Sequence, residues 1–198
     1  MVFGAYLSTD AGEDSLRGIG VRDSKKLSKK KRERLRQVLP GMAEGHSIVA
    51  VEPEELDGAS LNEIGKDVIV RLALELRPDV LILDAPVPPA GIPAYRAQIV
   101  QRLEAAGFDT SRLEVIAENG ADDTYPCCSA ASILAKTHRD GLLAKLEEAQ
   151  GRPIGSGYPS DPKTVTFLKD LWARDRAWPH FVRTKWETVR RIEAEFTP

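Results

Sequence analysis

Val80-Leu81-Ile82-Leu83-Asp84-Ala85-Pro86 is the stretch of sequence that decides the fold. Four consecutive apolar residues are typical of a β-strand that is buried on both faces. A carboxylate follows directly at Asp84. In α/β proteins, ligands bind in the crevice beyond the carboxyl ends of the strands, so Asp84 is a candidate functional residue. An aspartate that only begins a turn before Pro86 would give the same pattern.

Predicted strands and helices alternate on both sides of this stretch. Further strands are predicted at residues 1–7, 47–51 and 113–117. Helices are predicted where apolar residues recur at helical spacing, which occurs at residues 29–39, 64–76, 95–103 and 129–146. Residues 8–20 are predicted to form a loop. This alternation predicts an α/β layer domain.

The last part of the sequence predicts helices alone. Asp161 and Pro162 supply an N-cap and a first helical residue. Residues 184–187 fit a capping box for a final helix. We therefore expect two regions, an α/β domain over residues 1–150 and a helical C-terminal portion over residues 151–198.

The composition is that of a globular protein, with 198 residues, of which 42% are hydrophobic and 29% charged. No run approaches 18 apolar residues, so the sequence predicts no membrane-spanning helix. The N-terminus does not resemble a signal peptide. The two cysteines, Cys127 and Cys128, are adjacent and cannot build a disulfide framework. We expect a cytoplasmic protein with no membrane association.

Positive charge is concentrated between Arg22 and Arg36. This segment has nine Lys or Arg residues and two acidic residues, a net charge of +7, whereas the whole chain has a net charge of −2. Such a run is typical of a phosphate-binding patch, although a solvated helix face gives the same pattern. Ser28 can cap a helix carrying the run, with Leu35, Val38 and Leu39 on its buried side.

Asp122 and Asp123 follow the strand predicted at 113–117 and are a second candidate site. One carboxylate ahead of a helix is usually an N-cap. Two adjacent carboxylates near a second strand end are more consistent with a metal site, since Mg²⁺ takes few protein carboxylates and keeps waters and substrate phosphates. With Asp84 and the basic run, they indicate metal-assisted phosphodiester chemistry.

Tyr158, between Gly157 and Pro159, is a third candidate. Its ring could stack on a sugar or base while its hydroxyl contacts a 2′-OH. A tyrosine that packs its loop onto the core would have the same flanking residues. The three histidines have no metal-ligand spacing.

Three segments of the sequence resemble ribonuclease HII, the type 2 ribonuclease H family, and its archaeal–eukaryotic branch in particular. They are residues 21–27, 121–140 and 155–164, with weaker matches at 61–63 and 182–186. The segments occur in the family order and span nearly the whole chain. The resemblance implies a ribonuclease H-like mixed sheet flanked by helices.

The resemblance also implies an activity and a set of site residues. The family cleaves the RNA strand of RNA–DNA hybrids and incises 5′ to a single ribonucleotide in duplex DNA. It holds Mg²⁺ or Mn²⁺ with four carboxylates, of which Asp84 and Asp122 match two. The implied partners are hybrid and ribonucleotide-containing duplexes, and we expect a monomer.

The implied substrate contacts come from several segments. Tyr158 matches the family tyrosine that senses the 2′-OH, which assigns substrate binding to the helical portion over residues 151–198. Ser24 and Lys25 match a segment that lies near the nucleic-acid backbone. Lys136 belongs to the family's helix motif that follows Asp122.

This sequence departs from the family pattern at its start. The family opens with a strand bearing an Asp-Glu pair, followed by a Gly-Arg-Gly turn, whereas residues 1–7 resemble the next strand of the family. Residues 9–13 have only a superficial likeness to the missing motif. We expect the first strand to be absent and its neighbours to expose unpaired backbone groups. A start codon assigned too late would explain this, and the alternative is a non-enzymatic hybrid-binding protein.

Overall fold

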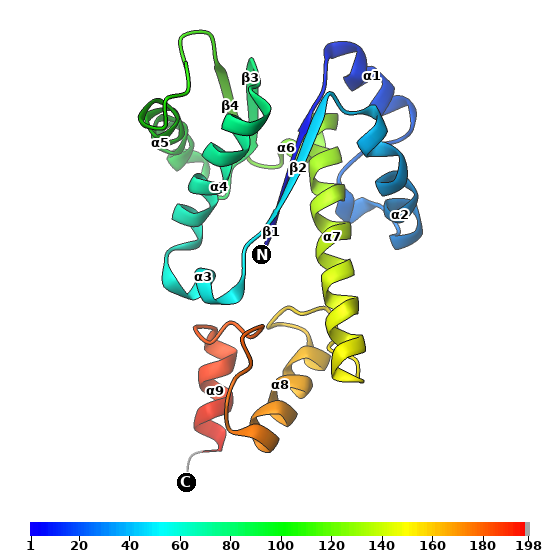
Figure 1. Ribbon diagram of the computed structural model, residues 1–198, viewed down its shortest axis with the longest axis vertical. Helices are drawn as coiled ribbons and strands as arrows, with labels where there is room; N and C mark the ends of the chain where they lie inside the picture. The colour runs from blue at the N-terminus through cyan, green and yellow to red at the C-terminus, as the bar shows by residue number, and fades with distance from the viewer. Residues whose placement is uncertain (197–198) are drawn as a thin grey trace. The chain divides into compact units, whose positions relative to one another are not determined.

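The computed structural model describes residues 1–196, which form two compact units (Figure 1). The first, called the sheet unit, comprises residues 2–49 and 61–138. The second, called the helical unit, comprises Met1, residues 50–60 and residues 139–196. No helix within residues 1–196 is long and apolar enough to span a membrane.

The sheet unit holds all the strands of the described chain. Its elements are β1 (Val2–Leu7), α1 (Asp10–Gly18), η1 (Ser24–Lys26), α2 (Lys29–Val38), η2 (Leu39–Met42), β2 (Gly45–Ala50), α4 (Leu61–Leu76), β3 (Val80–Asp84), η3 (Pro89–Gly91), α5 (Ile92–Ala105), β4 (Glu114–Glu118), α6 (Ala121–Thr124) and the first half of α7 (Pro126–Gln150). The predicted alternation of strands and helices is confirmed. Helices follow three of the four strands directly, as expected for an α/β protein.

The strands form two separate pairs. β1 pairs with β2, and β3 pairs in parallel with β4, in a register that places Asp84 opposite Glu118. Within residues 1–196, no strand pairs with the second edge of β1 or of β3. The mixed α/β architecture with a helical C-terminal part is as predicted, but the sheet is divided between two pairs of strands.

Strand β3 is less buried than its sequence predicts. Val80 is 44% exposed, Leu81 and Ile82 are half-buried, and Leu83 alone among these four is buried. The prediction of a strand buried on both faces was therefore wrong. The physical reason is that β3 has one neighbouring strand instead of two, so its apolar side chains are only partly covered.

Two apolar clusters hold the sheet unit together. Members of the first come from β1, α1, α2 and α7, and members of the second from α4, α5, β3 and β4. Helix α7 approaches β1 so closely that a Cβ at Gly4 would collide with the carbonyl group of Ala131. Only glycine permits this approach of strand to helix.

Residues 8–20 contain a helix where the sequence predicted a loop. Helix α1 begins after Thr9, whose hydroxyl oxygen accepts a hydrogen bond from the backbone N–H of Gly12 at 3.2 Å. Leu16 on this helix is almost fully buried. An N-cap and one apolar anchor therefore suffice for a short helix in an otherwise acidic segment.

Helix α2 begins as predicted but buries fewer side chains. The Ser28 side chain caps it by accepting from the N–H of Lys31 at 3.3 Å. Leu35 and Leu39 are buried, whereas Val38 is 44% exposed, which corrects its predicted place on the buried side. Val38 is the last residue of α2, after which the chain tightens into η2, and Leu39 is the residue that is buried there.

The helical unit contains α3 (Pro53–Gly58), the second half of α7, α8 (Pro162–Asp175) and α9 (Glu187–Glu195). Its buried core includes Leu168, Leu171, Val189 and Ile192. Asp161 caps α8 by accepting from the N–H of Lys163 at 2.9 Å, as the sequence predicted.

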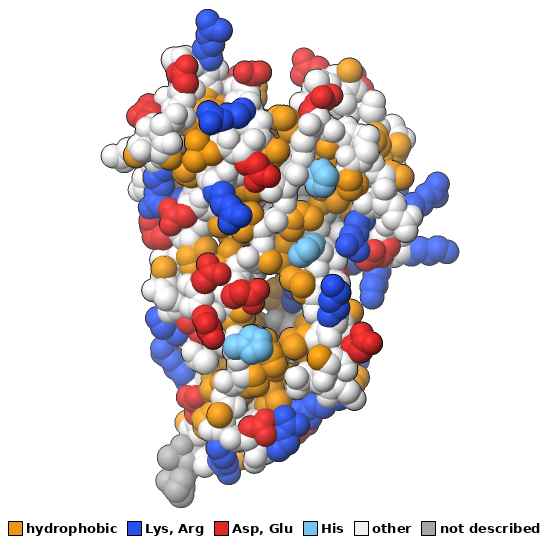
Figure 2. Space-filling view, in the orientation of Figure 1, with side chains coloured by type: hydrophobic (Ala, Val, Ile, Leu, Met, Phe, Trp, Pro, Cys, Tyr) orange, Lys and Arg blue, Asp and Glu red, His pale blue; other side chains and the backbone are white. Residues whose placement is uncertain are grey.

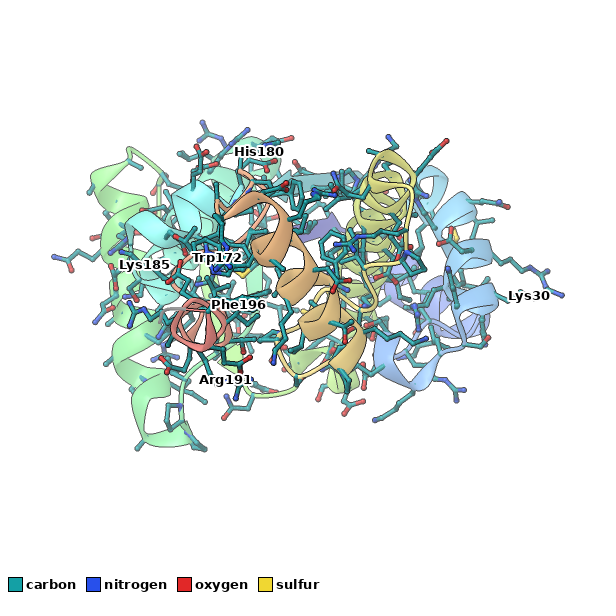
Figure 3. All side chains as sticks on the ribbon, turned by 90° about the horizontal axis from the view of Figure 1, so that it is seen from below. Lys30, Trp172, His180, Lys185, Arg191 and Phe196 are labelled. Carbon is teal, nitrogen blue, oxygen red and sulfur yellow. The ribbon has the colours of Figure 1, made fainter. Side chains whose placement is uncertain are left out.

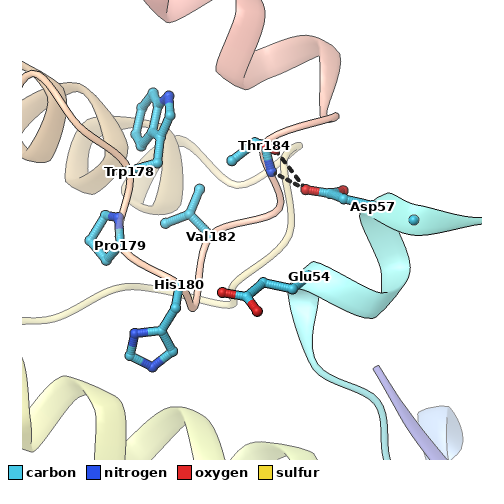
Figure 4. Close-up of a pocket in the computed structure, with 8 residues that line it drawn as sticks. Glu54, Asp57, Trp178, Pro179, His180, Val182 and Thr184 are labelled. Carbon is cyan, nitrogen blue, oxygen red and sulfur yellow. Dashed lines mark hydrogen bonds between the residues drawn. The ribbon is translucent and has the colours of Figure 1, made fainter.

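The predicted capping box at residues 184–187 was wrong. Helix α9 starts after Trp186 without a side-chain cap. Thr184 instead donates to Asp57 Oδ2 of α3, from its N–H at 2.6 Å and its hydroxyl at 2.8 Å (Figure 4). A tertiary partner distant in sequence therefore takes the hydroxyl that a local cap would have used.

Candidate active site

Parallel pairing of β3 and β4 brings two candidate segments to one edge. Asp84 ends β3, and its Oδ1 accepts a hydrogen bond from the N–H of Gly120 at 2.8 Å. Asn119 donates from Nδ2 to the carbonyl oxygens of Ala85 at 2.7 Å and Val87 at 2.8 Å. These bonds tie together the two strand ends, where ligands bind in α/β folds.

Asp122 lies just beyond this junction, in α6, and is only 6% exposed. Burial raises its pKa, the ammonium group of Lys25 opposes that shift, and the negative charges of Asp23 and Asp84 raise the pKa further. Lys25 Nζ lies 3.8 Å from Asp122 Oδ2. Asp84 and Asp122 are thus within electrostatic reach of each other, beside a single lysine.

The start of the basic segment contributes directly to this site. Asp23 caps η1, and its Oδ1 accepts from the N–H of Lys25 at 2.9 Å. The hydroxyl oxygens of Ser24 and Ser132, on α7, are 3.0 Å apart, and Lys26 pairs with Asp123. Of the two residues identified from the sequence, Lys25 therefore lies beside Asp122, and Ser24 contacts α7.

Helix α7 carries Lys136 and the two cysteines. Lys136 is half-buried and follows Ser132 by four residues, so the two share a helix face. Cys128 Sγ lies 3.7 Å from the carbonyl oxygen of Ile82 in β3. A hydrogen bond with Cys127 and burial raise the pKa of the Cys128 thiol. A raised pKa disfavours the thiolate, which is the nucleophilic form of cysteine.

Tyr158 belongs to the helical unit, in the loop between α7 and α8. It is 50% exposed, so it does not fill a core. Gly155 and Gly157 have φ values of +88° and +70°, and these left-handed conformations give the loop its shape. The ring is presented by a tightly built loop and keeps half of its surface accessible.

The oxygen ligands at the edge of the sheet are of the type that binds a hard divalent cation, but they make up only part of a metal site. Asp84 and Asp122 supply carboxylate oxygens, the ligand type preferred by Mg²⁺, which usually keeps waters and substrate phosphates as its other ligands. Within residues 1–196, no group of three or more His, Cys, Asp or Glu side chains could hold a metal ion. The described residues therefore provide a partial carboxylate site.

Asp23 is a site residue that the sequence reasoning missed. It is 6% exposed and contributes to the raised pKa of Asp122. A carboxylate can be buried only where it is hydrogen-bonded or paired, and the Asp23 carboxylate accepts a hydrogen bond from the N–H of Lys25. The signal was its position between the apolar Val21 and Leu27, both of which are buried.

A cavity of about 350 Å³ lies elsewhere, within the helical unit (Figure 4). The residues that line it are Glu54, Asp57, Gly58, Trp178, Pro179, His180, Val182 and Thr184. None of the candidate site residues identified from the sequence lines this cavity. The candidate site in the sheet unit is instead built from charged groups at a sheet edge.

The chain is similar to known proteins over nearly its whole length. The family model for ribonuclease HII matches residues 1–189. The ribonuclease HII of Pyrococcus furiosus is 40% identical over 185 residues, covering 91% of this chain and 78% of the relative. That of Methanosarcina barkeri is 36% identical over 204 residues, covering 98% and 89%. The chain belongs to the ribonuclease HII family.

Solved structures agree with this assignment. The ribonuclease H2 of Pyrococcus horikoshii matches with a TM-score of 0.85 and 36% identity, over 98% of this chain and 90% of that one. The RNase HII in a PCNA complex from Archaeoglobus fulgidus matches with a TM-score of 0.80 and 34% identity, over 96% and 86%. Family membership makes the chain a ribonuclease H, an endonuclease that hydrolyses RNA in RNA–DNA hybrids.

Proposed function

We propose that the chain cleaves the RNA strand of hybrids and also incises 5′ to single ribonucleotides in duplex DNA, with Asp84 and Asp122 holding Mg²⁺ or Mn²⁺. The observation that carries the proposal is the meeting of the β3 and β4 ends, which brings Asp84 and Asp122 within electrostatic reach of each other. Lys25 lies at the same place. Metal-assisted phosphodiester hydrolysis requires carboxylates that hold the metal ion. A lysine beside them can bind the substrate phosphate.

Each residue has a distinct role in this proposal. A bound divalent ion would activate water and stabilise the leaving 3′-oxygen. Asp84 and Asp122 would supply its carboxylate ligands, and Lys25 would leave Asp122 to contact a substrate phosphate. Ser24 and Lys136 would contact the nucleic-acid backbone. Tyr158 would direct its hydroxyl to the ribonucleotide 2′-OH, which distinguishes RNA from DNA.

The direct test is hydrolysis of a duplex that contains one ribonucleotide, with Mg²⁺ or Mn²⁺. We expect cleavage on the 5′ side of the ribonucleotide and none in a matched all-DNA duplex. Asp84→Asn and Asp122→Asn should each abolish cleavage. A folded chain that cleaves hybrid RNA but leaves the single ribonucleotide intact would restrict the function to hybrids.

A second candidate function is binding of RNA–DNA hybrids without efficient cleavage. It is favoured by the absence, within residues 1–196, of a group of three or more metal-ligating side chains. Fewer carboxylate ligands should weaken metal binding. Hybrid binding that persists without cleavage at millimolar Mg²⁺ and Mn²⁺ would support it. An in-frame Asp-Glu-Ala-Gly-Arg-Gly upstream of Met1 in the gene would favour the enzyme instead.

We also propose that the protein acts as a monomer in the cytoplasm. Asp84 and Asp122 come from one chain and lie at one sheet edge, so the carboxylate pair needs no second copy. Light scattering after size-exclusion chromatography tests the monomer, and fractionation of cells tests the location.

A further inference from the structure

Arg139 of α7 lies against the ring of Tyr158. The central carbon of its guanidinium group is 4.3 Å from the centre of the ring, and both residues belong to the helical unit. A guanidinium over an aromatic face is held by attraction to the ring electrons and by stacking. This contact defines the plane of a ring that is otherwise half exposed.

The same guanidinium also contacts the backbone of the loop. Arg139 Nη2 donates to the carbonyl oxygen of Ser156, and Nη1 donates to Asp140 Oδ1 at 3.3 Å. A Cβ at Gly157 would lie 3.0 Å from Nη2. Arg139 therefore contacts three successive residues of the loop, and its planar group fits closely against all of them.

Other residues hold the loop backbone independently of Arg139. Asp161 Oδ2 accepts from the N–H of Ser156 at 2.6 Å, and Thr164 Oγ1 accepts from the N–H of Gly157 at 3.0 Å. The carbonyl oxygen of Tyr158 accepts from the N–H of Asp161 at 3.1 Å. Loss of the guanidinium should therefore change the orientation of the ring without unfolding the loop.

We propose that Arg139 is a positioning residue for Tyr158 and holds the phenol ring in the orientation in which its hydroxyl meets the 2′-OH. The inference rests on the proposed role of Tyr158. Lysine keeps the positive charge but lacks the planar group that stacks and donates at fixed angles. Arg139→Lys therefore separates orientation of the ring from simple attraction of phosphate.

The experiment measures binding, so it does not depend on cleavage. Fluorescence anisotropy without divalent ions gives Kd for two duplexes of equal length, one all-DNA and one with a single ribonucleotide. The ratio of these Kd values measures selectivity. We expect Tyr158→Ala and Arg139→Lys each to lower the ratio roughly three- to tenfold. The double variant should show no further loss, because the arginine acts through the tyrosine.

Arg152 provides a matched control in the same unit. Its guanidinium carbon lies 4.5 Å from the ring centre of Phe167, and its Nη2 donates to the Phe167 carbonyl oxygen at 3.1 Å. Arg152→Lys removes an equivalent stacked arginine from the same segment between α7 and α8, but one that lies on the ring of Phe167 and not on that of Tyr158. It should leave the selectivity ratio unchanged, and melting temperatures of all variants show that each is folded.

The outcomes separate this inference from the proposed function. A wild-type ratio of one, or an unchanged ratio in Tyr158→Ala, overturns the role of Tyr158 and the inference together. A ratio that falls in Tyr158→Ala but not in Arg139→Lys overturns only the inference. Losses that add in the double variant would also overturn only the inference, because Arg139 would then affect selectivity independently of Tyr158.

Discussion

At the scale of the residue, Asp122 shows a conflict between stability and function. Burial raises its pKa, so its ionised form destabilises the folded protein near neutral pH. The protonated carboxyl of Asp122 favours the folded state, and this contribution is fully present when the pH is below 3.8, the ordinary pKa of aspartate. The contribution is lost as the pH rises through the raised pKa of the folded state. Metal binding nevertheless needs the ionised carboxylate.

Asp122→Asn should therefore abolish cleavage without lowering the stability of the metal-free protein. The neutral amide avoids the burial of charge. The lost ion pair with Lys25 costs little stability, because the Lys25 side chain is 79% exposed. Urea unfolding at pH 5 and pH 7 checks this, and the variant should gain most over the wild type at pH 7. Asp123→Asn, at a half-exposed position, is the control. A large loss of stability in Asp122→Asn would contradict the prediction.

Tyr158→Phe removes a single oxygen and tests the proposed contact with the 2′-OH. The variant should lose preference for the junction between DNA and a ribonucleotide by about 1–3 kcal/mol, as expected when a buried polar group loses its partner. Its melting temperature should barely change, because the ring is half exposed and keeps its contact with Arg139. Mapping of cleavage positions gives the measurement. A fully active variant with unchanged junction specificity would refute the sensing role.

At the scale of the element, one carboxylate joins α3 to the segment before α9. Asp57 Oδ2 accepts from Thr184 and from the N–H of Lys185 at 3.3 Å. Burial raises the pKa of Asp57, but these hydrogen bonds and the charge of Arg183 outweigh it. The pKa therefore lies below the ordinary 3.8.

Asp57→Asn should destabilise the protein by about 1–2 kcal/mol at neutral pH, because an amide accepts these bonds less well than a carboxylate does. The contribution of Asp57 is fully present above pH 3.8 and is lost as the pH falls through its lowered pKa. Chemical denaturation at pH 7 and pH 3 checks this. Glu54→Gln, at an exposed position of the same helix, should have no effect. An equal difference at both pH values would contradict the sign.

The separated strand pairs make a second prediction at this scale. Ala85 donates its N–H toward β4, to Glu118 at 2.7 Å, and successive residues of a strand point in opposite directions. The N–H groups of Ile82 and Asp84 therefore face the unpaired edge of β3. In hydrogen exchange they should exchange much faster than those of Leu83 and Ala85. Equal protection of both sets would contradict the prediction that this edge of β3 is open.

At the scale of the whole molecule, charge is distributed unevenly. Acidic and basic side chains are intermixed over the face shown in Figure 2. On α2, by contrast, Lys29, Lys30 and Arg34 are exposed, and no acidic side chain within residues 1–196 pairs with them. Lys30 points outward from the ribbon (Figure 3). This surface continues from the segment that supplies Lys25 to the candidate site.

Replacement of Lys29, Lys30 and Arg34 by glutamine should weaken duplex binding and reduce its salt dependence. Each lost phosphate contact lowers the slope of log K against log salt by about 0.9. Titration between 50 and 200 mM salt, roughly the range in which such contacts dominate, gives the slope. A matched triple variant at Arg71, Arg96 and Arg112 changes the charge equally at exposed positions elsewhere. Identical slopes in the two variants would refute a specific basic surface.

Much of the fold follows from local sequence signals. The spacing of apolar residues predicts α4 and α5. Ser28 and Asp161 are predicted as N-caps from their own side chains and the residues that follow them. Strand positions follow from apolar runs bounded by turn residues. These features depend on neighbours within a few residues, so the sequence alone can specify them.

The family also follows from the sequence, through the segments at residues 21–27, 121–140 and 155–164. Asp84 and Asp122 are candidates from the sequence because Asp84 ends one predicted strand and Asp122 follows the next. Tertiary structure alone decided the bond from Thr184 to Asp57 and the stacking of Arg139 on Tyr158. It also decided that β3 is an edge strand. Burial and partner choice depend on residues that are distant in the chain, and no local pattern encodes them.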